Sequence, residues 1–348
     1  MSWEELGSHY EQRGLVLALG AGVSVGSGLP TWDTLMRRIA VRIVGTEEIV
    51  TALKSEGLSL PAIASVLKSM NREYQFEGLV RTELYREFPF RNGITPSNRA
   101  EFIALTQQRN KTLAAVASLC AVSVKGPSEA LFERNPRIQA IIDFNLDSVL
   151  RSYIRERYQT PILRSVERAS KASELSKIST YYMHGFLRFD VDGEDPSAEA
   201  PDQMVLTEQE YFDFFNRPTS LFNYTFLYLL REYPCLFIGL SMVDDNLRRL
   251  LHYSRVERES AYRSEGRVSR AKKDAIRHFA VLLRKVYELD QLIEGSLKNL
   301  GVTVLWVESY EEIPERFKKM YGASGGDWEA VSRKLPNPAV ATDGCRRR

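Results

Sequence analysis

Four short polar segments carry residue types that could bind a nucleotide and act on it. Gly20-Ala21-Gly22, Asn145-Leu146-Asp147 and Gly239-Leu240-Ser241 each follow an apolar run, and His184 follows a shorter one. A glycine-rich turn exposes backbone N–H groups that suit phosphate. An asparagine side chain both donates and accepts hydrogen bonds, and a histidine titrates near neutral pH. Together these residue types could bind phosphate, orient a substrate and transfer a proton.

The apolar runs are typical of strands in a parallel sheet. They lie at 15–19, 138–144, 179–183, 235–238, 279–283 and 302–307, and helix-spaced apolar residues separate them. This alternation predicts an α/β fold with a Rossmann-like open parallel sheet. Because ligands of such sheets bind at the carboxyl ends of the strands, we expect the four polar segments to converge there.

Long segments without strand patterns indicate how the chain is divided into a domain, an insertion and a tail. Residues 46–133 carry helix-spaced apolar residues, so we interpret them as a mainly helical insertion. The domain that contains it is expected to span 1–322, with a C-terminal tail at 323–348. The charged segment 255–273 is expected to be a solvated connection, helical in part.

The composition argues against several classes of protein and of binding site. The 348 residues include 47 basic and 45 acidic ones, and the formal net charge of +2 argues against electrostatically driven binding to nucleic acids or membranes. Cys120, Cys235 and Cys345 lie far apart, which argues against a disulfide framework and a four-thiolate zinc site. The first residues do not resemble a secretion signal, and no apolar run approaches the roughly 20 residues of a membrane span. We expect a cytoplasmic protein without a metal.

The glycine-rich segment extends beyond its first three residues. A simple dinucleotide fingerprint would place a third glycine at position 25, which is Val25. The full run from Gly20 to Pro30 instead resembles the first NAD-binding loop of the sirtuin superfamily. The resemblance implies contacts with NAD+ from Gly20, Ala21, Gly22, Ser24, Ser27 and Gly28.

The other three segments extend this resemblance in the order that the family has. They look like its Asn-x-Asp, His-Gly and Gly-x-Ser motifs. The resemblance implies that Asn145 and Asp147 line the nicotinamide and ribose pocket. It further implies that His184 is the general base and that Gly239 and Ser241 hold the adenosine side. NAD+ is then the substrate, and no metal is required.

The chain also departs from the protein-deacylating sirtuins. Pro30 is followed by Thr31-Trp32 instead of Asp-Phe-Arg, and the cysteines of the zinc module are absent. This form resembles the sirtuin-like domains of bacterial anti-phage defence proteins, which act as NAD+ glycohydrolases. The resemblance implies a regulated effector that cleaves NAD+ to nicotinamide and ADP-ribose and depletes it in abortive infection. An NAD-dependent protein deacylase and a non-catalytic sensor of NAD+ or ADP-ribose are the alternatives.

Several residues have a second interpretation. Asp147 could cap the helix that follows it, and Ser241 could be a turn residue. Trp32 is expected to pack in the core or at the rim. Ser241, His184 and Asp147 could form a hydrolytic triad, but the sequence lacks the Gly-x-Ser-x-Gly elbow.

Regulation is expected to come from assembly, because a permanently active NADase would kill its producer. We expect a homo-oligomer and an activating partner from a neighbouring gene, for example a HerA-like ATPase. No sequence-specific contact with nucleic acid and no membrane contact are expected.

Overall fold

The computed structural model describes residues 3–71, 75–123, 137–159, 162–166, 177–189, 204–216, 221–266, 271 and 276–322. Seven parallel strands form one open sheet in the order β3-β4-β2-β1-β5-β6-β7. The strands are β1 (Leu15–Leu19), β2 (Ile138–Asp143), β3 (Leu163–Val166), β4 (Ile178–Tyr182), β5 (Cys235–Ile238), β6 (His278–Leu283) and β7 (Val302–Val307).

Six of these strands lie where the apolar runs predict them, and the α/β class is confirmed. All five residues of β1 are buried, as expected for a central strand that is covered on both faces. The edge strand β3 was not predicted. Its sequence, Leu163-Arg164-Ser165-Val166, has two polar residues in the middle and so lacks an apolar run, and three of its four residues are only half-buried.

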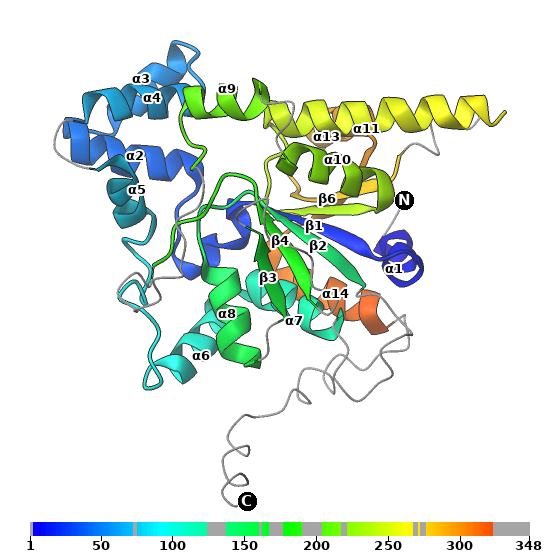
Figure 1. The fold of residues 1–348 in the computed structure, drawn as a ribbon, viewed down its shortest axis with the longest axis horizontal. Helices are drawn as coiled ribbons and strands as arrows, with labels where there is room; N and C mark the ends of the chain where they lie inside the picture. Colours follow the sequence, from blue (N-terminus) through cyan, green and yellow to red (C-terminus); the bar gives the residue numbers. More distant parts are fainter. Residues whose placement is uncertain are drawn as a thin grey trace, which may run out of the picture.

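Helices cover both faces of the sheet, and Figure 1 shows α10 and α11 above it and α7, α8 and α14 below it. Side chains alternate between the two layers, so Leu15, Leu17 and Leu19 pack in one apolar core and Val16 and Ala18 in the other. The helices that contribute to the first core include α1 (Trp3–Gln12), α2 (Trp32–Val44), α7 (Lys111–Ser123), α8 (Val149–Tyr158) and α14 (Ile313–Gly322). The second core includes α10 (Leu221–Glu232), α11 (Asp245–Ser264) and α13 (Tyr287–Lys298).

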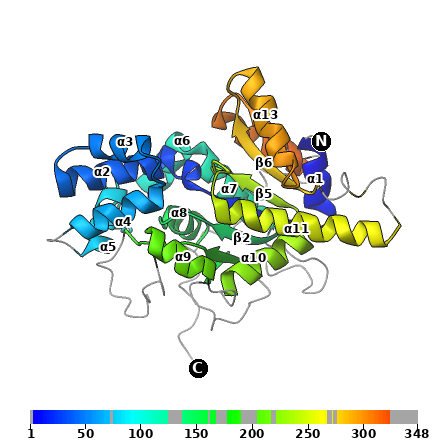
Figure 2. The same ribbon diagram turned by 90° about the horizontal axis from the view of Figure 1, so that it is seen from above.

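The described part of the segment 46–133 is helical and contains no strand. Its helices are α3 (Glu48–Ser55), α4 (Leu60–Met70), α5 (Phe76–Leu84), α6 (Arg99–Arg109) and α7. Figures 1 and 2 both place α2 to α5 to one side of the sheet. Buried residues of these helices, such as Ile63, Val80 and Val116, belong to the same core as β1. The helices therefore share one apolar core with the sheet.

Side chains next to several helix starts cap those helices. Thr31 caps α2 by accepting the Thr34 N–H, and Asp244 caps α11 by accepting the Leu247 N–H at 2.7 Å. Thr207 and Glu210 bond reciprocally at the start of α9 (Glu208–Asn216).

The segment 255–273 begins inside α11, which continues to Ser264. This part of the segment is helical, as expected, and most of its residues are exposed, although Arg258 is buried. Among the described residues, no helix has the length and apolar character needed to cross a membrane. Cys120 and Cys235 are buried and free, whereas Cys345 and the expected tail 323–348 lie outside the described residues.

Candidate functional site

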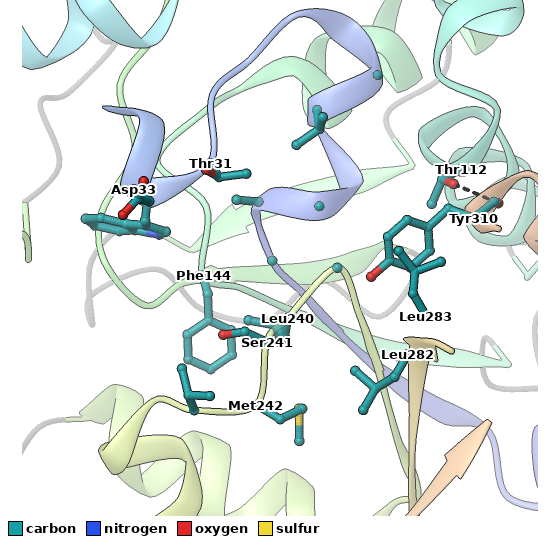
Figure 3. A pocket seen from close by; sticks show the side chains of 18 of the residues that line it. Thr31, Asp33, Thr112, Phe144, Leu240, Ser241, Met242, Leu282, Leu283 and Tyr310 are labelled. Atoms are coloured by element: carbon teal, nitrogen blue, oxygen red, sulfur yellow. Dashed lines mark hydrogen bonds between the residues drawn. The ribbon is translucent and has the colours of Figure 1, made fainter. Parts of the chain in front are cut away.

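A cavity of about 870 Å³ lies at the carboxyl ends of the central strands. Ligand sites of proteins typically have about 300–1,000 Å³. Figure 3 shows Thr31 and Asp33 at one end of it, Phe144, Leu240 and Ser241 near its middle, and Leu283 and Tyr310 at the other end. These residues follow strands β1, β2, β5, β6 and β7, so the cavity lies where the topology of a parallel sheet predicts a ligand.

The glycine-rich segment after β1 forms two short 3₁₀ turns, η1 (Ala21–Val23) and η2 (Val25–Ser27). It packs against the turn after β5. Gly20 N–H donates to the Ile238 carbonyl at 2.9 Å, and Gly22 N–H donates to the Gly239 carbonyl at 3.0 Å. A Cβ on Gly20 would lie 2.6 Å from the Gly239 carbonyl oxygen, so this approach requires a glycine. The two turns together form one wall of the cavity.

The predicted site residues divide among three cavities. Gly20, Ala21, Gly22, Gly239 and Ser241 line the large one. Ser24, Asn145 and Asp147 line a small cavity of about 20 Å³, which shares Ala21 and Trp32 with the large one. Ser27 and Gly28 line a third cavity of about 180 Å³, together with Phe88 and Phe90, and this cavity shares Gly26 and Arg109 with the large one. His184 lines none of the three.

The small cavity is lined by buried polar groups. Asn145 is buried, its N–H donates to Asp143 Oδ1 at 2.9 Å, and its Oδ1 is buried without a hydrogen-bond partner among the described residues. Asp147 accepts the N–H of Val149, the first residue of α8, at 3.0 Å and also a hydrogen bond from the Ser24 side chain. Asp147 therefore supports the start of α8 and lines the cavity as well.

Two buried carboxyl groups flank Asn145. Burial raises the pKa of Asp143 well above its usual value, and the nearby charge of Asp147 adds to this rise. Burial also raises the pKa of Asp147, whereas the Ser24 hydroxyl opposes the rise. The pair therefore holds a proton more readily than two exposed carboxylates would.

His184 lies among aromatic rings next to the cavities. Its ring centroid is 5.5 Å from that of Phe144, 6.1 Å from that of Trp32 and 5.3 Å from that of Tyr211. Its Nε2 lies 3.4 Å from the Tyr211 hydroxyl, and Nδ1 makes no hydrogen bond of ordinary geometry among the described residues. Burial lowers the pKa of His184, and the charge of Asp244 opposes this. The imidazole is therefore neutral at pH 7. It packs against Phe144 and Trp32, and these two rings line the large cavity.

Three residues at the cavities were not predicted as site residues. Trp32, expected to be packing, forms part of the wall between the large and the small cavity. Arg109 borders the large and the third cavity. Asn110 Nδ2 donates to the Val23 carbonyl at 2.8 Å and to Ser27 Oγ at 2.9 Å, and its Oδ1 accepts the Leu113 N–H at 3.0 Å. An asparagine between two helical patterns indicates a cap, but no local signal indicates its contact with a segment more than 80 residues away.

The charges on the wall of the large cavity are predominantly basic. Its acidic side chains are Asp33, which pairs with Arg37 and Lys54, and Glu311, which pairs with Lys111. Arg109 and Lys285 also line it and make no ion pair within the described residues. An anionic ligand therefore meets basic side chains whose charge is not already neutralised.

The remaining histidines lie elsewhere. His9, His252 and His278 line none of the three cavities, and His278 is fully buried, with its Nδ1 accepting the Cys235 N–H at 3.1 Å. Within the described residues, no three potential metal-ligating side chains of His, Cys, Asp or Glu come together.

One known family model matches a part of the chain that contains several of these residues. Residues 139–305 match the family model described as "SIR2-like domain". The matched range includes Asn145, Asp147, His184, Gly239 and Ser241, and it begins after the glycine segment, which contacts it through Gly239. A comparison with curated proteins finds no match. SIR2-like domains use NAD+ and have the open parallel α/β sheet that is seen here. The chain therefore contains a sirtuin-like domain, formed on a Rossmann-like sheet.

Proposed function

We propose that this protein hydrolyses the bond between nicotinamide and ribose in NAD+ and releases nicotinamide and ADP-ribose. The observation that carries the proposal is the buried Oδ1 of Asn145, which has no partner among the described residues. Asn145 lines a cavity that adjoins both the glycine segment and the large cavity. A buried acceptor without a partner is unfavourable unless it serves a ligand or a water molecule.

The small cavity is suited to the attacking water. Its volume of about 20 Å³ exceeds the roughly 10–15 Å³ that one water needs, and Asn145, Asp147 and Ser24 supply the polar partners that such a water requires. The pyridinium is already a good leaving group, so the reaction needs mainly an oriented water next to the ribose. Asn145 therefore serves to orient this water or a ribose hydroxyl.

His184 is the general base of this proposal. In the reaction the water oxygen bonds to the ribose C1′, the C1′–N bond breaks, and its electron pair passes to the nicotinamide nitrogen. The released proton needs an acceptor. His184 is neutral at pH 7 because burial lowers its pKa, although a hydrogen bond with the Phe144 backbone and the charge of Asp244 oppose this, so it can accept a proton. Asp147 lines the small cavity itself and is the alternative acceptor.

The large cavity accommodates the rest of NAD+. The glycine segment and the guanidinium of Arg109 suit the diphosphate, and a Cβ on Gly26 would lie 2.7 Å from the Arg109 carbonyl oxygen, so the two elements are in direct contact. We place the adenosine toward Gly239 and Ser241, which line the large cavity together with the apolar side chains of Leu282 and Leu283.

We further propose that this activity depletes NAD+ in anti-phage defence. The support is the Pro30-Thr31-Trp32 sequence, which resembles that of defence-associated sirtuin-like domains, together with the position of Trp32 at the wall between the two cavities. Control by a homo-oligomer and by an activating partner such as a HerA-like ATPase belongs to the same proposal, because unregulated cleavage would be lethal to the cell.

The decisive experiment is incubation of the purified protein with NAD+ and separation of the products. Wild type is expected to release nicotinamide and ADP-ribose, and Asn145→Ala and His184→Ala are each expected to lower kcat by about 100-fold or more. Asn223→Ala, which changes a buried asparagine of α10 that lines none of the three cavities, is the matched control. Nicotinamide release that depends on an acetylated peptide would instead indicate a deacylase. NAD+ binding without turnover, with or without the neighbouring-gene partner, would indicate a sensor.

A further inference from the structure

The large cavity differs in charge from a site that selects NAD+ against NADP+. In Rossmann-type sites an acidic side chain binds the 2′-hydroxyl of the adenine ribose in NAD, whereas a basic side chain accommodates the 2′-phosphate of NADP. Among the described residues that line this cavity, the two acidic side chains are already paired with Arg37, Lys54 and Lys111. Both oxygens of Asp33 are engaged by Arg37 and Lys54, and Glu311 binds Lys111 through Oε2, so basic partners already balance the negative charge of both carboxylates.

Lys285 is a basic side chain that lines the large cavity. It follows β6, whose neighbour β5 leads directly into the Gly239–Ser241 turn, and Ile238 pairs with Val281 in this part of the sheet. Lys285 and Ser241 therefore follow neighbouring strands, and both line the large cavity. The Lys285 N–H donates to Oδ1 of buried Asp290 at 3.0 Å, which fixes the backbone of Lys285. Its ammonium group makes no ion pair within the described residues.

The other basic side chains of this wall have different roles. Arg248 donates to the Met242 carbonyl and to Ser296 Oγ, both at 3.1 Å, and so connects the turn after β5 with α13. Arg109, at the end of α6, lies next to the glycine segment, because its carbonyl oxygen would be 2.7 Å from a Cβ on Gly26. Among the described residues, Lys285 is thus a cavity-lining cation without an ion pair, and it follows the strand next to the turn where we place the adenosine.

We propose that Lys285 binds a 2′-phosphate on the adenine ribose, so that the protein cleaves NADP+ as well as NAD+. This inference depends on the proposed function. The balanced reaction is NADP+ with water giving nicotinamide, 2′-phospho-ADP-ribose and a proton. The bond that breaks and the bond that forms are the same as for NAD+, because the 2′-phosphate is remote from the reacting ribose.

The test compares the two substrates in three variants. Wild type is expected to cleave NADP+ with a kcat/KM within about tenfold of that for NAD+. Lys285→Gln is expected to lower the ratio of kcat/KM for NADP+ to that for NAD+ by about tenfold, the effect of losing one charge-assisted hydrogen bond to phosphate. Arg109→Gln is expected to lower both values similarly, because both substrates carry the diphosphate. Lys298→Gln on the exposed side of α13 is the matched control and should change neither value.

A binding measurement separates this inference from the proposed function. Calorimetric titration of wild type and Lys285→Gln with adenosine 2′,5′-bisphosphate and with adenosine 5′-monophosphate requires no turnover. A preference of wild type for the bisphosphate that Lys285→Gln loses supports the 2′-phosphate site even if no cleavage occurs. Cleavage of NAD+ with a hundredfold or greater discrimination against NADP+ would overturn this inference and leave the proposed function intact. Equal ratios in wild type and Lys285→Gln would also overturn it.

Discussion

Gly22 and Gly239 join two parts of the chain that are more than 200 residues apart in the sequence. The Gly22 N–H donates to the Gly239 carbonyl at 3.0 Å, and a Cβ on Gly22 would lie 2.7 Å from the Gly239 Cα. Gly239 has φ of +71°, a left-handed conformation that favours glycine. Gly239 lies within the sirtuin-like match and Gly22 outside it, so this contact completes the site.

Replacing Gly22 tests this contact directly. In Gly22→Ala the new methyl group meets backbone atoms, which cannot move aside as a flexible side chain could. We expect a loss of about 1–3 kcal/mol in the free energy of unfolding and a clear loss of NAD+ affinity. Gly78→Ala in α5 is the control, because a Cβ there has no neighbour within 4 Å. Denaturant titration and calorimetric NAD+ binding measure the two effects, and a Gly22→Ala protein that matches Gly78→Ala in both would contradict the expectation.

The anchoring of the glycine segment by Asn110 can be separated from its role as a helix cap. Asn110→Asp keeps the oxygen that accepts the Leu113 N–H but removes the two donations to Val23 and Ser27. We expect both Asn110→Asp and Asn110→Ala to raise the KM for NAD+ several-fold. Asn110→Ala also loses the cap, worth about 1 kcal/mol. Asn110→Asp keeps the cap but sets a buried carboxylate oxygen against the Val23 carbonyl oxygen, so we expect it to lose more stability than Asn110→Ala. Steady-state kinetics and thermal unfolding of both variants are the measurements. Equal KM values for Asn110→Asp and wild type would exclude the anchoring role.

The buried His278 makes stability depend on pH. Burial lowers its pKa well below the usual value, and the charges of Arg258 and Arg277 lower it further. Below a pH of about 6.5 the unfolded chain binds a proton at this position and the folded protein does not, so the free energy of unfolding falls as the pH decreases. The contribution is at most about 1.4 kcal/mol per pH unit for this group.

His278→Gln is therefore expected to show a shallower loss of stability than wild type between pH 6.5 and 5. The difference between the two proteins isolates this residue from His9 and His184, whose pKa values burial also lowers. His252→Gln, on the exposed face of α11, is the matched control. Denaturant titrations at several pH values measure the effect, and parallel curves for wild type and His278→Gln would rule it out.

The buried pair of Asp143 and Asp147 makes the free energy of unfolding depend on pH in the opposite direction to His278. Burial raises the pKa of Asp143 well above the usual value, so the folded protein binds a proton there in a pH range in which the unfolded chain does not. The stabilisation that this proton provides is present at low pH and is lost as the pH rises through the raised pKa.

Asp143→Asn keeps an acceptor for the Asn145 N–H and removes the charge next to Asp147. We expect its stability to increase relative to wild type as the pH rises from about 5 to 8. Asp245→Asn, at an exposed position in the first turn of α11, should show no such trend. Thermal unfolding across this range would decide the matter, and a stability difference between Asp143→Asn and wild type that stays constant with pH would be evidence against the buried charge.

The sequence by itself determined the α/β class, six of the seven strands and the polar segments at their ends. These features depend on local patterns: an apolar run such as Leu15–Leu19 predicts a buried strand wherever it occurs, and Thr31 and Asp244 cap helices within three residues of themselves. The convergence of Gly20, Asn145 and Gly239 also followed, because parallel strands bring their carboxyl ends to one edge of the sheet.

Only the tertiary structure decided how the site is divided. It places Asn145 and Asp147 at a cavity of about 20 Å³ and Ser27 and Gly28 at a third cavity of about 180 Å³. His184 lies next to the cavities without lining them. Cavity volumes, the burial of Asn145 Oδ1 and the contact of Asn110 with Val23 depend on the packing of segments far apart in sequence. No local pattern records such packing, because it depends on the size and position of every side chain between the segments.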